Sequence, residues 1–218
     1  MDKTPPPLSL SAALALPLPE GRRSSEIFVD GDLELRLYAP KGQDPQTPHD
    51  RNEFYIVARG NGKFRAGDRV EAFAPGALIY VAAHETHRFE DFTDDFAAWV
   101  VFYGEVKKPP ATGRTYWQMP LTAACELTLP LGRASAEAFV DGDIEVRFAA
   151  PSTLGMQVPH DRDEFYVVAT GTGRYRINDR EMPIGPGDLL FAAAHAEHGF
   201  VARSDDFAEW IVFYGPVK

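Results

Sequence analysis

The chain of 218 residues has a single cysteine, Cys125. An internal disulfide therefore cannot form, and a reducing, cytoplasmic location is expected. No apolar run approaches the roughly 20 residues of a membrane span, and prolines interrupt the mildly apolar stretch LSLSAALALPLP (8–19), which we do not read as a signal peptide. The 22 basic residues are outnumbered by 32 acidic ones, for a net charge of −10. Because nucleic-acid binding needs a basic face, we expect neither nucleic acid nor membrane as a partner.

The chain contains an internal duplication with a constant offset of 111 positions. PHDRNEFYIVARG (48–60) returns as PHDRDEFYVVATG (159–171), and DDFAAWVVFYG (94–104) returns as DDFAEWIVFYG (205–215). No insertion or deletion interrupts this offset between residues 26 and 104. Such self-similarity indicates two copies of one module, and about 100 residues is a normal domain size. We therefore predict an N-terminal domain over 1–104, a linker over 105–116 and a C-terminal domain over 117–218.

The local patterns are those of β-strands. Residues 32–38 alternate polar and apolar side chains, and residues 54–58 and 97–103 are rich in β-branched and aromatic types. The sequences GNG (60–62) and GTG (171–173) are typical of tight hairpin turns. Only a short helical turn is expected, within residues 9–16. Eighteen prolines and eighteen glycines among many short strands predict an all-β barrel or sandwich in each half.

All six histidines of the chain take part in the duplication, together with one glutamate. The pairs at this offset are His49 and His160, His84 and His195, His87 and His198, and Glu53 and Glu164. Imidazoles and carboxylates are the usual ligands of divalent transition metals. Their repetition at one spacing indicates a site that is built twice.

These residues carry a resemblance to a known family. The spacing of His49, Glu53 and Gly60 resembles the first motif of the cupin superfamily. APGALIYVAAHETHRF (74–89) and GPGDLLFAAAHAEHGF (185–200) resemble its second motif, in which a Pro-Gly turn and a strand precede a metal-binding histidine. The resemblance covers about 80 residues in each half. It implies a bicupin, an all-β protein of two tandem cupin-type (double-stranded β-helix or jelly-roll) barrels with the ligands lining each interior.

The resemblance assigns one metal-binding triad to each half: His49, Glu53 and His87, and His160, Glu164 and His198. Two imidazoles and one carboxylate leave coordination positions open on a divalent ion such as Fe, Mn, Ni or Zn. Because His49 and Glu53 are four residues apart, they would face the same side of a single strand. His87 would come from another strand.

The sequence departs from the family at the expected fourth ligand. The family's first motif is His-x-His, but the first histidine is replaced by Thr47 in one half and by Val158 in the other. Gln46 and Gln157 stand one residue earlier in both copies. Their amide oxygens are candidate additional metal ligands, and the alternative is a role in a turn or in hydrogen bonding.

Two other repeated pairs are candidate catalytic residues. His84 and His195 precede the metal-binding histidine by three residues, where an imidazole could act as acid or base. The alternative is a turn histidine that caps a carbonyl. Tyr55 and Tyr166 share strand parity with the two glutamates, so we expect them to face the cavity.

The favoured function is a small-molecule metalloenzyme of oxygenase, isomerase or lyase type, with one mononuclear metal site per barrel. The alternative is a non-catalytic barrel that binds or senses a small molecule. A storage role is a third hypothesis, and the intact triads argue against it. The fold itself does not choose among these functions, and the resemblance also allows a homodimer.

Overall fold

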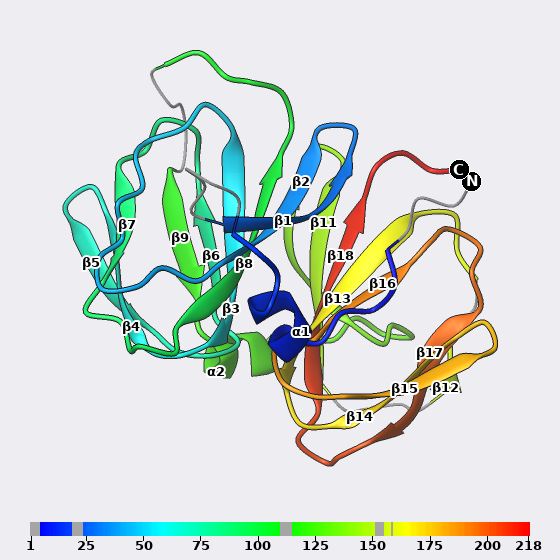
Figure 1. The fold of residues 1–218 in the computed structure, drawn as a ribbon. Coiled ribbons are helices and arrows are strands. Elements are labelled where there is room, and N and C mark those ends of the chain that lie inside the picture. The colour runs from blue at the N-terminus through cyan, green and yellow to red at the C-terminus, as the bar shows by residue number, and fades with distance from the viewer. Residues whose placement is uncertain (1–4, 19–23, 110–114, 151–154, 158) are drawn as a thin grey trace. The chain divides into compact units, whose positions relative to one another are not determined.

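The computed structural model describes residues 5–18, 24–109, 115–150, 155–157 and 159–218. Their secondary structure is mostly β, with two helices of five residues each, α1 (Leu10–Leu14) and α2 (Leu121–Cys125). α1 confirms the helical turn expected near the N-terminus. Among the described residues, neither helix is long or apolar enough to cross a membrane. The chain divides into two compact units, each built from two antiparallel sheets (Figure 1).

The N-terminal unit has a six-stranded and a three-stranded sheet. The larger sheet has the order β1-β2-β8-β3-β6-β9. Its strands are β1 (Ser24–Asp30), β2 (Leu33–Tyr38), β3 (Asn52–Arg59), β6 (Leu78–Val81), β8 (Ala97–Tyr103) and β9 (Tyr116–Met119). The smaller sheet has the order β5-β4-β7. Its strands are β4 (Gly62–Ala66), β5 (Arg69–Phe73) and β7 (His87–Glu90).

The C-terminal unit repeats this plan in the yellow-green to red part of the ribbon (Figure 1). A five-stranded sheet has the order β10-β11-β18-β13-β16. Its strands are β10 (Ala136–Asp141), β11 (Ile144–Ala149), β13 (Asp163–Thr170), β16 (Leu189–Ala192) and β18 (Ala208–Tyr214). A four-stranded sheet has the order β12-β17-β14-β15. Its strands are β12 (Gly155–Met156), β14 (Gly173–Ile177), β15 (Arg180–Ile184) and β17 (His198–Arg203).

In each unit the core lies between its two sheets. Tyr55 from the larger N-terminal sheet packs in one cluster with Phe64 and Phe89 from the smaller sheet. The central strands β3 and β13 are buried along almost their whole length, because both of their faces are covered. Trp99 and Trp210, identical in the two copies, are fully buried. The two cupin-type barrels expected from the sequence are therefore the observed architecture.

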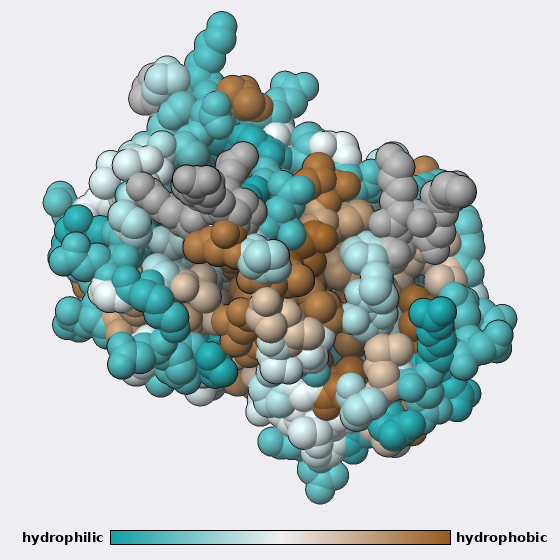
Figure 2. Space-filling view, in the orientation of Figure 1, coloured by the Kyte–Doolittle hydropathy of each residue, from teal (hydrophilic) through white to brown (hydrophobic). Residues whose placement is uncertain are grey.

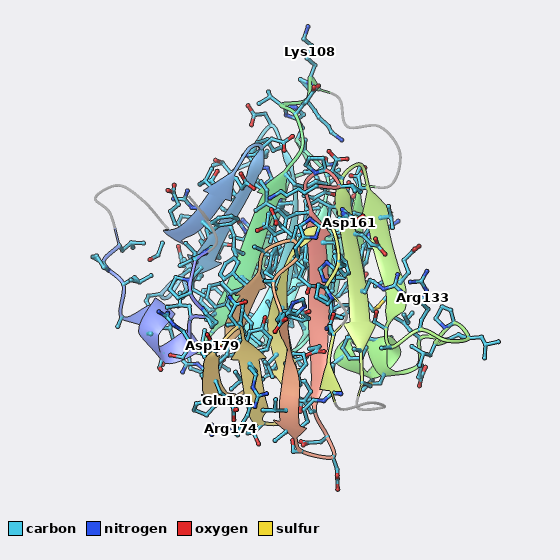
Figure 3. All side chains as sticks on the ribbon, turned by 90° about the vertical axis from the view of Figure 1, so that its right-hand side faces the viewer. Lys108, Arg133, Asp161, Arg174, Asp179 and Glu181 are labelled. Carbon is cyan, nitrogen blue, oxygen red and sulfur yellow. The ribbon has the colours of Figure 1, made fainter. Side chains whose placement is uncertain are left out.

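The outer hairpins are polar. β5 is exposed at four of its five residues, and Figure 2 shows hydrophilic residues over the β4–β5 hairpin. On the β14–β15 hairpin, Arg174 Nε lies 2.5 Å from Glu181 Oε1 at the surface (Figure 3). Exposed ion pairs of this kind contribute only about 0–1 kcal/mol to stability, so these hairpins owe their form to backbone pairing and the core beneath.

The GNG and GTG segments form tight connections, but not the hairpins that we expected. β3 pairs with β6 and β8, whereas β4 belongs to the other sheet, so residues 60–62 turn the chain from one sheet to the other. Gly60 and Gly171 have φ values of +83° and +76°. A Cβ atom would stand 2.6 Å from Phe96 Cα at Gly60 and 2.5 Å from Phe207 Cα at Gly171. The glycines are needed because this crossing brings two backbones into contact.

The duplicated segments are exchanged between the units. β9 lies beyond most of the predicted linker, yet it pairs with β6 through Met119 and Leu78 in the N-terminal unit. Leu8, which precedes Met119 by 111 positions, exchanges two backbone hydrogen bonds of 2.8 and 2.9 Å with Leu189 in the C-terminal unit. Each repeat thus begins with a segment that completes the sheet containing the other repeat.

The compact units consequently differ from the predicted domain boundaries. One comprises Ser11–Leu121, and the other joins the described residues up to Leu10 with Thr122–Lys218. A repeat offset shows which segments correspond, but not which sheet a segment joins. Part of the predicted linker, residues 110–114, lies outside the described residues.

Candidate metal centres

The structure brings the N-terminal triad together inside the barrel. His49 Nε2 lies 2.8 Å and His87 Nε2 lies 2.7 Å from the same oxygen, Glu53 Oε1. Glu53 and His87 are buried at the starts of β3 and β7, and the His49 side chain is 21% exposed. Three ligand atoms therefore converge within 4.8 Å, with one open flank at His49.

The expectation that His49 and Glu53 share one strand was wrong. β3 begins at Asn52, so His49 lies in the preceding loop. Pro48 precedes it, and proline disfavours continuation of a paired strand. The loop, rather than the strand period, carries the imidazole over Glu53.

Backbone carbonyls orient both imidazoles. His49 Nδ1 is 2.8 Å from the Arg51 carbonyl, and His87 Nδ1 is 2.7 Å from the Glu85 carbonyl. A carbonyl oxygen only accepts, so Nδ1 carries the proton in each ring. In the neutral ring Nε2 then has the free lone pair, and it is directed at the glutamate, which is the arrangement that metal-ligating histidines usually have.

The buried carboxylate of Glu53 needs positive charge close to it. Burial opposes ionisation of Glu53, but the charge of a protonated His87 and the close approach of both imidazoles lower the pKa of this carboxyl to about 2. Burial also opposes charge on His87, yet Glu53 raises the pKa of that imidazole. Glu53 Oε2 has no hydrogen-bond partner in the described part of the chain, and the approach of His49 Nε2 is not that of a hydrogen bond. Protons or a metal cation would satisfy these electron pairs, and the donor set suits a divalent ion.

The C-terminal triad has the same form. His160 Nε2 is 2.9 Å and His198 Nε2 is 2.5 Å from Glu164 Oε1. β13 supplies Glu164, β17 supplies His198, and His160 lies in the loop before β13. Burial opposes ionisation of Glu164, but hydrogen bonds from the two histidines lower its pKa. Glu164 Oε2 also lacks a partner among the described residues.

A tyrosine and a glutamine stand beside each triad. Tyr55 Oη is 2.7 Å from Glu53 Oε1 and 3.0 Å from Gln46 Oε1. In the other half, Tyr166 Oη donates to Glu164 Oε1, and Gln157 Nε2 donates to Tyr166 Oη over 2.9 Å. Strand parity predicted the position of both tyrosines.

The glutamines reach their tyrosines from loops, because neither Gln46 nor Gln157 lies in a strand. Simple strand alternation therefore does not apply to them. Thr47 lines the N-terminal cavity, whereas Val158 lies outside the described residues. Burial and the adjacent glutamate raise the pKa of the Tyr55 and Tyr166 hydroxyls well above the ordinary value, so both keep their protons at neutral pH.

A cavity of about 330 Å³ opens beside the N-terminal triad. It is lined by Ser24, Tyr38, Gln46, Thr47, His49, Tyr55, Val100 and Phe102. This volume is at the small end of the range for ligand sites, and its lining includes the polar side chains of Gln46, His49 and Tyr55. Tyr38 corresponds to Ala149 in the other copy. Asp44, which holds the loop of this cavity, was missed, because it does not recur at the repeat offset.

His84 and His195 occupy the turns before β7 and β17 with φ values of 67° and 66°. Their backbone N–H groups donate to the carbonyls of His49 and His160, each over 2.7 Å. The His84 ring lies 2.7 Å from the Lys107 carbonyl. These contacts favour the turn-capping alternative for His84 and make both residues supports of the triad loops. Their predicted acid–base role stays a prediction.

Comparison with known proteins agrees with the geometry. The model of the cupin domain family matches residues 35–103 and 145–214. An uncharacterized protein of Streptomyces coelicolor is 34% identical over 79 residues, which cover 35% of this chain and 75% of that protein. A cupin 2 conserved barrel domain protein from Leptotrichia buccalis has a TM-score of 0.69 at 14% identity, covering 98% of both chains.

A salicylate 1,2-dioxygenase from Pseudoaminobacter salicylatoxidans is also similar in structure. Its TM-score is 0.70 at 15% identity, over 98% of this chain and 85% of that one. At this identity the likeness establishes the fold alone. Each matched region contains one complete triad. The first contains His49, Glu53 and His87, and the second contains His160, Glu164 and His198. The chain therefore belongs to the cupin family, with one cupin domain in each half of its duplicated sequence.

Proposed function

We propose that each barrel binds one divalent transition-metal ion through its triad, and that the loaded protein is an enzyme of oxygenase type acting on a small oxygen-bearing molecule. The observation that carries the proposal is the convergence of two imidazoles and one carboxylate on a single point, twice, with one oxygen of each glutamate unpartnered. Two histidines and one carboxylate with open positions are the donor set of non-haem iron oxygenases. The fold neighbours include a salicylate 1,2-dioxygenase, one form of it in complex with gentisate.

The roles of the protein side chains follow from their contacts. His49, Glu53 and His87 would hold the ion in the N-terminal barrel, and their counterparts would hold it in the other. A bound ion supplies Lewis acidity and, if it is iron, access to oxygen chemistry. Tyr55 keeps a proton 2.7 Å from the glutamate and lines the cavity, so it can donate a hydrogen bond to a bound molecule. The apolar walls, Val100 and Phe102, restrict water around that molecule.

The first test is elemental analysis of untagged protein beside the His49→Ala/His160→Ala double variant. We expect close to two equivalents of metal in the parent and almost none in the variant. The matched control is His84→Asn/His195→Asn, which also removes two histidines. Asparagine tolerates the left-handed backbone of these turns, so this control should retain both ions.

Activity is then measured as oxygen consumption by the iron-loaded protein with small hydroxylated aromatic acids, gentisate included. Turnover that disappears in the His49→Ala/His160→Ala variant supports the oxygenase class. Metal binding without turnover on any such compound would contradict it and favour the binding or sensing alternative. Absence of metal after reconstitution with each candidate ion would overturn the metalloenzyme altogether. The rate of the His84→Asn/His195→Asn control decides whether these histidines act in catalysis.

A further inference from the structure

We propose that the two metal sites are not equivalent, and that Asp44 makes the N-terminal site the first to take up metal. The inference deepens the proposed function and rests on it, because it concerns the order in which the two triads are filled. It is carried by one difference between the copies: the N-terminal half has Asp44 where the C-terminal half has Gly155.

Asp44 accepts four hydrogen bonds in the loop beside the N-terminal cavity. Its Oδ1 accepts hydrogen bonds from the Tyr38 hydroxyl and from the Gln46 backbone N–H, the latter over 2.9 Å. Its Oδ2 accepts from Gln46 Nε2 and from the Phe89 N–H, both over 2.7 Å. Phe89 lies two residues after His87 in β7. Asp44 thus ties the loop to the strand that provides a triad histidine.

This carboxylate determines the orientation of the Gln46 amide. An ionised carboxylate only accepts hydrogen bonds, so the NH₂ group of Gln46 has to face Asp44. The carbonyl oxygen Oε1 is therefore turned the other way, where it lies 3.0 Å from Tyr55 Oη. The amide orientation, which is ordinarily inferred from the surrounding network, has one solution here.

The orientation matters because Tyr55 has one proton and competes with a metal for the triad. Its hydroxyl lies 2.7 Å from Glu53 Oε1 and 3.4 Å from His87 Nε2, the atoms that a metal would use. An ion binds His87 and Glu53 most strongly when the tyrosine proton has another acceptor. Gln46 Oε1 is that acceptor, so the hydroxyl can turn away from the triad and remain hydrogen-bonded.

In the described contacts of the C-terminal half, the tyrosine proton has no acceptor outside the triad. Gln157 Nε2 donates to Tyr166 Oη over 2.9 Å, so the Tyr166 proton points at the triad. Its acceptors are Glu164 Oε1 and His198 Nε2, the latter 3.1 Å away. Both atoms belong to residues of the triad. A metal at this site therefore shares Glu164 with the Tyr166 hydroxyl, which makes the carboxylate a weaker ligand, unless the Gln157 amide flips; no carboxylate among the described residues holds that amide.

The test measures metal affinity in proteins that retain one triad. His198→Ala leaves the N-terminal triad, and His87→Ala leaves the C-terminal triad. Titration with Co²⁺, followed by calorimetry and by the visible spectrum of the bound ion, should show tighter binding in the His198→Ala protein by about tenfold, the scale of outer-shell effects on metal sites. Adding Asp44→Ala should remove most of this advantage and change the Co²⁺ spectrum. The matched control is Asp44→Ala in the His87→Ala background, where it should change neither the Co²⁺ affinity nor the Co²⁺ spectrum.

A second variant separates hydrogen bonding from loop folding. Gln46→Leu deletes the acceptor but leaves the contacts of Asp44 to Tyr38 and Phe89, and it should weaken Co²⁺ binding by a similar factor in the His198→Ala background. Tyr166→Phe removes the competing proton and should tighten binding in the His87→Ala background.

Equal affinity of the two single-triad proteins, with no effect of Asp44→Ala or Gln46→Leu, would overturn this inference while leaving the metalloenzyme intact. If neither single-triad protein binds Co²⁺, or any other candidate ion, the proposed function itself fails and the inference with it.

Discussion

The two barrels keep the same triads but differ in the walls behind them. In the N-terminal barrel, Tyr38 on β2 stands opposite Ala98 on β8. The equivalent cross-strand pair in the C-terminal barrel is Ala149 opposite Glu209. The larger side chain of the pair is thus a tyrosine on the first strand in one barrel and a glutamate on the second strand in the other. The two triads are therefore identical in residue type, whereas the side chains of the neighbouring strands differ.

A second substitution accompanies this exchange. Phe92 in the first copy corresponds to Arg203 in the second. Arg203 Nη1 lies 3.9 Å from Glu209 Oε1, and its guanidinium lies over the rings of Phe200 and Phe207 at 5.3 and 5.5 Å. The acid and the base thus appear together in one copy, as expected when a buried charge needs a partner. The two barrels therefore differ in charge near the same triad.

The largest expected effect is on the triads themselves. Glu53→Gln and Glu164→Gln should each remove one metal equivalent while leaving the other. Loss of a ligand should lower the metal affinity by more than the roughly 10- to 100-fold seen when a residue that hydrogen-bonds to a ligand is changed. Elemental analysis and calorimetry check this. Loss of both ions from either single variant would show that the barrels do not act separately.

The glycines at the sheet crossings should have large and equal effects on stability. Gly60→Ala and Gly171→Ala each combine a positive φ with a steric overlap, and should lower the free energy of unfolding by about 3 kcal/mol. Gly31→Ala is the control, since it has a φ of +59° but open space around the new methyl group; it should cost only about 1–2 kcal/mol. Chemical denaturation measures all three. A marked difference between Gly60→Ala and Gly171→Ala would break the equivalence of the two crossings.

The smallest expected effect concerns Glu209. Burial raises the pKa of its carboxyl well above the ordinary value, because Arg203 compensates only in part. A carboxyl with a raised pKa in the folded state favours folding at low pH, and this contribution is lost as the pH rises above the unfolded value of about 4.5 towards the folded one. Glu209→Gln has no ionisable group at this position, so its stability does not fall in this way as the pH rises. Its stability relative to the parent should therefore increase between pH 5 and pH 8, by roughly 1 kcal/mol.

Thermal unfolding across that pH range provides the measurement. Glu26→Gln, at a side chain that is 56% exposed, serves as the matched control. A difference between Glu209→Gln and the parent that stays constant with pH would contradict the assignment of a raised pKa to Glu209.

The duplication, the cupin fold and the residues that meet at each triad could all be predicted from the sequence. These follow from local information: the repeat offset, the period of two along strands, and motif spacing. Strand parity was sufficient for Tyr55, because Glu53 and Tyr55 share one face of β3. It failed for His49, because this residue lies in a loop whose path has no period.

Only the tertiary structure decided the exchange of edge segments and the role of Asp44. Leu8 and Met119 occupy equivalent repeat positions, yet the sheet that each completes depends on backbone hydrogen bonds between residues far apart in the chain. Asp44 left no signal in the duplication, since Gly155 takes its place. Its importance comes from four donors that surround it after folding, and such convergence cannot be read from a one-dimensional pattern.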